Sequence, residues 1–432
     1  MKTGLLIGGS AALLLLTACM GGTAAPDKDA AAGYDPDAAV EITWWTGQTE
    51  EAEKVAERLA AEYHAAHPNV TIRTSSGAPT TDDLLTKLSA GFTGGNYPDI
   101  SYAYGSWAGD LGASGKTQDL TSYVQDPSFK WEEMPAAARQ VATADGKVIG
   151  VPALVDNIAL LYNPALFDKA GVAYPTDQWS WEDFRSAARK LTDPASNTYG
   201  TAYSVSGSED TTWHLWPLLW QNGGQILDGN KPAFNSDAGV KALETLRQMA
   251  VDDKSMYLDQ TDERYWRLFN SGRIAMMMSG PWSMLDAKEA KLNYAVVNLP
   301  GVNGDHQTVS GPDLWVLFDH ADANRAGAAR AFITWLTSSA VDVRWNLAVG
   351  NLPLRSTEKD TGEFAAYVKE YPGGQKFFDN LANAKQARPT VPGYEELSRN
   401  VGDAIAAVLQ GRAQPKAALD AAAKKSESAL VN

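Results

Sequence analysis

The chain has 432 residues, of which 44% are hydrophobic and 21% charged, so it can bury a large core and is not a disordered chain. At about 150 residues per domain, this length suggests roughly two to three domains. Lys and Arg total 37 against 52 Asp and Glu, a formal net charge of -15, which argues against a nucleic-acid partner. The single cysteine excludes a disulfide framework and a thiolate metal cluster.

The N-terminus has the pattern of a secretory signal: a basic start, an apolar run at residues 5–16 and small residues before Cys19. This run is shorter than the about 20 residues that cross a bilayer. Residues 16–19 (Leu-Thr-Ala-Cys) resemble a bacterial lipobox, whose cysteine is diacylated; an ordinary signal with a chance cysteine is the alternative. We therefore expect a signal peptide at 1–18 and a lipidated flexible tether at 19–39.

After the tether, strand-like and helix-like patterns alternate. Residues 41–46 read as a strand, residues 52–63 carry an apolar stripe of helical spacing, and residues 70–74 are strand-like again. A helix around residues 82–90 and a strand that ends near Tyr104 follow. This alternation predicts an α/β layer with a mostly parallel sheet.

The same alternation resumes after residue 146 and continues to the C-terminus. The expected strands are 147–152, 157–162, 273–278, 294–299 and 314–318. The expected helices are 164–170, 181–191, 237–252, 262–270, 323–336, 395–410 and 416–426. Residues 180–183 (Ser-Trp-Glu-Asp) form a capping box that opens one of these helices.

Patterns that imitate enzyme and metal motifs are incomplete. Residues 115–117 (Gly-Lys-Thr) end like a phosphate-binding loop, but Asp110 stands where that loop needs a glycine. His64 and His67 lie at a helix end without an HExxH pattern, and no G-x-S-x-G elbow is present. A glycosidase carboxylate pair stays open, although no two acidic residues are singled out. We expect no metal and no cofactor.

Several short segments become informative through their order and spacing. They are residues 42–45 (Ile-Thr-Trp-Trp), 97–100 (Tyr-Pro-Asp-Ile), 145–152, 161–163 (Leu-Tyr-Asn), 181–184 (Trp-Glu-Asp-Phe), 280–282 (Gly-Pro-Trp) and 350–353 (Gly-Asn-Leu-Pro). Together they resemble the extracellular solute-binding proteins of bacterial ABC sugar importers (solute-binding family 1), of the trehalose and maltose types. The resemblance covers almost all of residues 40–432.

The resemblance implies two discontinuous α/β lobes joined by hinge crossings, a periplasmic-binding-protein-like fold with the ligand cleft between the lobes. The first lobe would take residues 40–152 and 300–352, and the second residues 153–299 and 353–432. The protein would be a monomer on the extracellular face of the cell membrane, held only by its lipid. It would capture a di- or oligosaccharide without chemical change and deliver it to an ABC permease.

Sugars present an apolar ring face and a rim of hydroxyls, so a sugar site needs flat aromatic surfaces and directional polar groups. The resemblance implies that Trp282 is a stacking platform and that Asp156 and Arg388 hold hydroxyls. Asp156 also stands at a strand junction with no basic neighbour in the sequence. The other expected ligand residues are Glu51, Tyr104, Trp213, Trp216, Gly311 and Asp313.

Some of these residues have a second interpretation or depart from the family pattern. Glu51 fits equally well as a negative charge in the first turn of a helix. Of Trp213 and Trp216, one is expected to reach the cleft, and core packing is the default for most of the other tryptophans. Tyr104 stands where relatives often have an acidic residue, and Asp313 stands where many have a tryptophan. These departures predict a ligand specificity that differs from that of the maltose type.

Two other functions stay open from the sequence. One is a secreted carbohydrate-active enzyme on an α/β scaffold, which would convert its ligand during a long incubation. The other keeps the fold but binds a polar metabolite that is not a sugar, such as a glycerophosphodiester.

Overall fold

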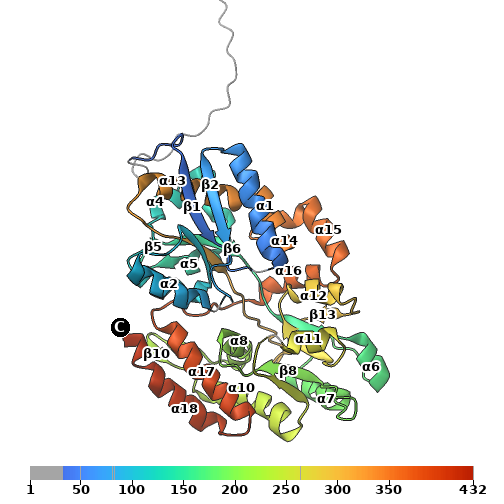
Figure 1. Ribbon diagram of the computed structural model, residues 1–432. Helices are drawn as coiled ribbons and strands as arrows, with labels where there is room; N and C mark the ends of the chain where they lie inside the picture. Colours follow the sequence, from blue (N-terminus) through green and yellow to red (C-terminus); the bar gives the residue numbers. More distant parts are fainter. Residues whose placement is uncertain (1–32, 49, 80, 82, 263, 432) are drawn as a thin grey trace, which may run out of the picture.

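The computed structural model describes residues 33–48, 50–79, 81, 83–262 and 264–431, with the backbone alone for residues 50, 51 and 431. The predicted signal peptide and Cys19 lie outside the described residues. The described chain forms two α/β lobes, one above the other in Figure 1. Each lobe combines segments that are far apart in the sequence.

A five-stranded sheet of order β2-β1-β3-β14-β6 forms the centre of the first lobe. Its strands are β1 (Val40–Trp45), β2 (Val70–Ser75), β3 (Ile100–Ala103), β6 (Gly150–Leu154) and β14 (Asp313–Leu317). Strand β1 is parallel to β2 and β3, whereas β14 is antiparallel to both β3 and β6. Four of the five strands therefore run in the same direction and β14 alone runs against them, so this sheet is mostly parallel, as predicted.

The helices of this lobe pack against the sheet. They are α1 (Glu50–Ala66), α2 (Asp83–Gly94), α3 (Ala108–Ala113), α4 (Thr121–Val124), α5 (Ala136–Val141), α13 (Ala323–Leu336) and α14 (Ser339–Ala348). The core between sheet and helices is rich in tryptophan. The ring centroid of Trp44 lies 5.1 Å from that of Trp315 and 6.0 Å from that of Trp345.

The Tyr-Pro-Asp-Ile segment has a structural role in this lobe. Asp99 is 1% exposed, and its carboxylate accepts the backbone N–H of Thr43 at 2.8 Å. The guanidinium of Arg325, on α13, donates to the same carboxylate at 2.9 and 2.7 Å. Asp99 therefore joins β1 to α13 through charge-assisted hydrogen bonds, which are stronger than neutral ones.

The second lobe is built on β7 (Ala159–Tyr162), β8 (Thr201–Ser204), β11 (Met256–Asp259), β12 (Met276–Ser279) and β13 (Ala295–Val297). Strand β7 lies between β12 and β13 and is antiparallel to both. Strands β8 and β11 are parallel, and a parallel bridge between Tyr199 and Ile274 joins β8 to β12. Strands β8, β11 and β12 therefore end at the same edge.

The helices of the second lobe surround this sheet, above and below it in Figure 1. They are α6 (Pro164–Ala170), α7 (Trp181–Leu191), α8 (Glu209–Trp213), α9 (Trp216–Gln221), α10 (Asp237–Arg247), α11 (Arg264–Asn270), α12 (Ser283–Glu289), α15 (Gly362–Glu370), α16 (Gly374–Asn380), α17 (Tyr394–Leu409) and α18 (Pro415–Ser426).

Three chain crossings connect the lobes. Val155 and Leu352 pair as an isolated antiparallel bridge, so the first and third crossings run side by side. Leu299 and Val309 both pack into the core of the second lobe, and Asp313 begins β14 of the first. The second crossing therefore lies between Val309 and Asp313. The residue ranges of the two lobes, apart from this crossing, stay a prediction.

Candidate ligand-binding site

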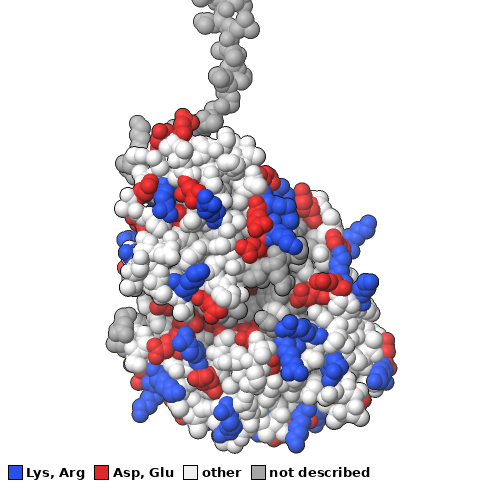
Figure 2. All heavy atoms as spheres, viewed as in Figure 1, with Lys and Arg blue, Asp and Glu red and all other residues white. Residues whose placement is uncertain are grey.

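A cavity of about 330 Å³ lies between the lobes and is lined by side chains of both. Small-ligand sites typically have volumes of roughly 300–1,000 Å³. Figure 2 shows the surface hollowed where the two lobes meet, with acidic side chains beside the hollow. The size and position of this cavity make it the candidate site.

The ends of strands bring the cavity residues together. In the first lobe Tyr104 follows β3 and Asp156 follows β6. In the second lobe Glu209 follows β8, Asp262 follows β11 and Trp282 follows β12. These are the carboxyl ends of the strands, the edge at which open α/β sheets bind their ligands.

Arg388 supplies the one guanidinium among the described residues that line the cavity, and it is 8% exposed. Its Nη1 donates to Oε1 of Glu209 at 2.8 Å, and its Nη2 lies 3.8 Å from Oδ1 of Asp313. Glu209 also accepts hydrogen bonds from the hydroxyls of Tyr394 and Ser398. Burial alone lowers the pKa of Arg388, but the charge of Glu209, with smaller effects of Tyr394 and Asp313, raises it overall.

Two buried carboxyl groups, Asp156 and Asp313, lie near each other at the ends of the paired strands β6 and β14. Oδ1 of Asp156 accepts the N–H of Gly311 at 2.8 Å, and Oδ2 of Asp313 accepts the hydroxyl of Tyr102 at 2.5 Å. Burial raises the pKa of Asp313 to about 6, and burial with the charge of Asp313 raises the pKa of Asp156 well above its usual range. A Cβ on Gly311 would lie 2.9 Å from Oδ1 of Asp156, so the pair needs glycine there.

We expect Asp313→Asn to be at least as stable as the parent at pH 7.5. The pKa of Asp313 is about 6 in the fold and about 3.9 in unfolded chains. The fold therefore binds this proton more tightly, and the stability of the parent alone falls as the pH rises from about 4 to about 6. The advantage of the variant should shrink as the pH falls from 6 towards 4. Urea unfolding at pH 7.5 and 4.5 measures it, and a variant less stable than the parent at pH 7.5 would contradict the prediction.

Aromatic rings form another wall of the cavity. Trp213 and Trp282 stack with centroids 5.8 Å apart and ring planes 20° apart. A Cβ on Gly280 would lie 2.1 Å from the indole of Trp282, so this glycine makes room for the ring. Trp266 and Tyr104 also line the cavity. The site therefore combines flat apolar faces with buried carboxylates.

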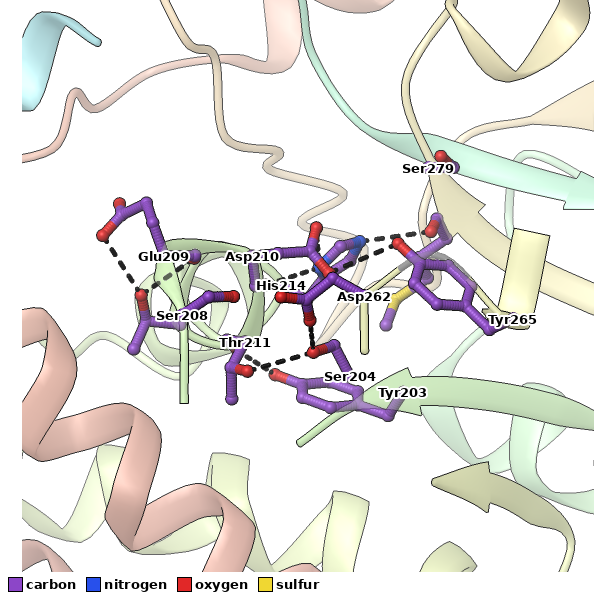
Figure 3. A network of polar contacts seen from close by, with 12 residues as sticks. Tyr203, Ser204, Ser208, Glu209, Asp210, Thr211, His214, Asp262, Tyr265 and Ser279 are labelled. Carbon is purple, nitrogen blue, oxygen red and sulfur yellow. Dashed lines mark hydrogen bonds and ion pairs between the residues drawn. The ribbon is translucent and has the colours of Figure 1, made fainter. Parts of the chain in front are cut away.

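Asp210 and Asp262 add acidic groups on the second-lobe side (Figure 3). The hydroxyl of Ser206 lies 2.7 Å from both carboxylate oxygens of Asp262, and Ser204 also donates to this carboxylate. Oδ2 of Asp210 accepts the hydroxyl of Tyr265 at 3.3 Å. Both carboxylates are thus oriented by neighbouring hydroxyls.

Most of the residues predicted from the sequence meet around this cavity. Those that line it are Tyr104, Asp156, Trp213, Trp282, Gly311, Asp313 and Arg388. Trp216 needs a correction: it is fully buried in the second-lobe core, where its Nε1 donates to the Tyr394 hydroxyl at 3.1 Å. Glu51 lies in the first turn of α1, and its side chain is outside the described part of the chain.

Sequence reasoning missed several lining residues, among them Tyr102, Glu209, Asp210, Asp262 and Trp266. The strands β8 and β11 were not predicted, so nothing placed the acids that follow them at a sheet edge. The signal that could have found Glu209 and Asp210 is their position as an acidic pair just before the tryptophan-rich residues 213–220.

Within the described ranges, no group of three or more His, Cys, Asp or Glu side chains is placed to hold a metal ion. No helix in the described part of the chain has the length and apolar character needed to cross a membrane.

Comparison with known proteins gives a family match over most of the chain. The family model for bacterial extracellular solute-binding proteins matches residues 58–372. The sn-glycerol-3-phosphate-binding periplasmic protein of Brucella melitensis is 22% identical over 411 residues, which are 91% of this chain and 94% of that protein.

Solved structures match over nearly the whole fold. The cyclic alpha-maltosyl-1,6-maltose binding protein of Arthrobacter globiformis superposes with a TM-score of 0.76 at 25% identity, over 90% of this chain and 99% of that one. An ABC substrate-binding protein of Listeria monocytogenes, in complex with cycloalternan, has a TM-score of 0.80 at 25% identity, over 90% and 97%. These matches confirm the predicted two-lobe fold.

Proposed function

The chain belongs to the bacterial extracellular solute-binding proteins, and from this premise we propose that it captures a di- or oligosaccharide between its lobes and delivers it to an ABC import permease. The observation that carries the proposal is the make-up of the cavity. The stacked pair of Trp213 and Trp282 offers flat apolar faces to sugar rings. Asp156 and Asp313 stand beside them as acceptors for hydroxyl groups.

The charge of the cavity favours this ligand class over a phosphate ester such as the one named for the Brucella relative. The described lining residues include four carboxylates, Glu209, Asp210, Asp262 and Asp313, the carboxyl group of Asp156 with its raised pKa, and a single guanidinium. That guanidinium, Arg388, is already paired with Glu209 at 2.8 Å. A phosphate would need a cation that is not neutralised, and it would meet an excess of negative charge at short range.

We propose a binding protein rather than a carbohydrate-active enzyme. A glycosidase needs two carboxyl groups free to act on the glycosidic bond. Glu209 is occupied by Arg388, Tyr394 and Ser398. Asp313 is held by hydrogen bonds from the Tyr102 hydroxyl and the backbone N–H of Gly105. These bonds support a fixed recognition surface.

A thermal-shift screen tests the ligand class. The panel contains neutral mono-, di- and oligosaccharides together with glycerol 3-phosphate and glycerophosphocholine. A ligand that binds only the folded state raises the midpoint of unfolding. We expect at least one neutral saccharide to raise it and both phosphate esters to leave it unchanged. Stabilisation by a phosphate ester alone would overturn the proposal.

We also propose that Cys19 carries a lipid that anchors a monomer to the extracellular face of the membrane. The support is the Leu-Thr-Ala-Cys pattern at residues 16–19, with the chain's single cysteine in the lipobox position. Cys19→Ala is expected to abolish incorporation of labelled palmitate and to leave the protein either released or in precursor form. Metabolic labelling with cell fractionation measures this. A variant still fully processed and tightly membrane-bound would show that Cys19 is not the anchor.

A further inference from the structure

We propose that His214 is a positioning residue that holds the stacked Trp213–Trp282 pair and the Asp210 carboxylate in place for the ligand. The role in ligand binding rests on the function proposed above. His214 directly follows α8 and is 6% exposed. It is not among the residues that line the cavity, so it acts through its neighbours.

The imidazole connects two separate elements of the second lobe (Figure 3). Its Nδ1 lies 2.7 Å from the carbonyl oxygen of Asp210, in α8. Its Nε2 lies 3.2 Å from the carbonyl oxygen of Met278, in β12. The ring therefore links a helix and a strand that no sheet hydrogen bond joins.

These two elements carry the two halves of the aromatic wall. Helix α8 ends at Trp213, and β12 leads through residues 280–281 to Trp282. The same helix bears Asp210, whose Oδ1 lies 3.5 Å from Nδ1 of His214. Loss of the imidazole would remove the direct hydrogen bond between the residue that follows α8 and β12, so the stacked pair would lose a contact that fixes its spacing.

Both contacts of the ring are to carbonyl oxygens, which only accept hydrogen bonds. A ring nitrogen that carries a proton can therefore donate to either carbonyl. The Asp210 carboxylate lies beside the ring and receives the hydroxyl of Tyr265, from α11. The ring of Tyr203, from β8, lies 5.9 Å from the imidazole, and that of Trp213 lies 6.0 Å away.

Near-ultraviolet circular dichroism tests this without any ligand. The signal of the stacked pair is the spectrum of the parent minus that of Trp213→Phe. We expect His214→Gln, whose side chain can donate from one nitrogen only, to lose more than half of this signal while its far-ultraviolet spectrum is retained. His67→Gln is the matched control, because His67 is exposed on the first lobe. It should keep the full signal.

A second variant, His214→Asn, decides the matter if His214→Gln fails to fold. Its shorter side chain should lose the same difference signal. A signal that either folded variant retains in full would overturn the proposal. The saccharide panel adds a separate arm: any thermal shift seen with the parent should fall by more than half in His214→Gln. A panel without any hit would count against the proposed function, and the spectra would still decide the role of His214.

Discussion

Replacing Arg388 with Ala is expected to destabilise the fold by about 3–5 kcal/mol at pH 7.5, the typical effect of removing one partner of a buried ion pair. Arg388 is 8% exposed and is the partner of Glu209 and a neighbour of Asp313. Without it, Glu209 and Asp313 would be buried without the guanidinium that opposes their charge. Unfolding in urea, followed by far-ultraviolet circular dichroism, measures the loss.

The pH dependence of this variant has a definite sign. The charge of Arg388 lowers the pKa of Asp313, which burial has raised to about 6. In Arg388→Ala the carboxyl should therefore take up its proton at a still higher pH, and protonation removes the uncompensated charge. The deficit in stability should be largest above pH 7 and should shrink by pH 5.

Arg399→Ala is the matched control for Arg388. Arg399 lies on α17 with an exposed side chain, 3.5 Å from Glu395. Exposed ion pairs contribute little to stability, so this variant should unfold close to the parent. Equal unfolding midpoints of Arg388→Ala and Arg399→Ala would contradict the role assigned to the buried guanidinium.

Replacing Trp282 with Ala is expected to weaken carbohydrate binding by about 2–4 kcal/mol, or roughly 30- to 1,000-fold in Kd. The indole stacks on Trp213 and lines the cavity from the end of β12. Truncation removes an apolar surface on which the ligand would stack. It also leaves Trp213 without its stacking partner. Calorimetric titration with the saccharide that gives the largest thermal shift measures the change.

Trp131→Ala is the matched control for this prediction. Trp131 is partly buried, as Trp282 is, but lies on the first lobe beside Phe129 and away from the cavity. Its loss should leave the affinity within twofold of the parent. If both variants bind with the affinity of the parent, the aromatic wall does not contact the ligand.

The part of the fold that could be predicted is the part with a clear hydrophobic period. Helix α1 buries Ala56, Leu59 and Tyr63 along one side and exposes charged residues along the other, so its sequence repeats with the helical period. In α9 every residue is buried, and in α14 even Asp342 and Asn346 are. A helix buried on most sides has no polar face, and the period that would mark it is absent.

The residues of the candidate site also divide into those that the sequence could place and those that it could not. Asp156 and Trp282 could be placed because the segments around them resemble a known family. Glu209 could not, because it follows a strand of four residues that carries no alternation. Trp213 and Trp216 could not be told apart, because they lie three residues apart in neighbouring helices and only the packing of α9 turns Trp216 into the core. Tertiary contacts, which local sequence does not contain, decide these cases.

The most direct test of the account is a calorimetric titration of the purified protein with the saccharide selected in the thermal-shift screen, with the sugar recovered from the same sample and analysed by chromatography. We predict saturable binding of one saccharide per protein chain and recovery of the sugar unchanged after prolonged incubation. Absence of saturable binding for every saccharide in the panel, or recovery of a hydrolysed or transferred product, would contradict the account.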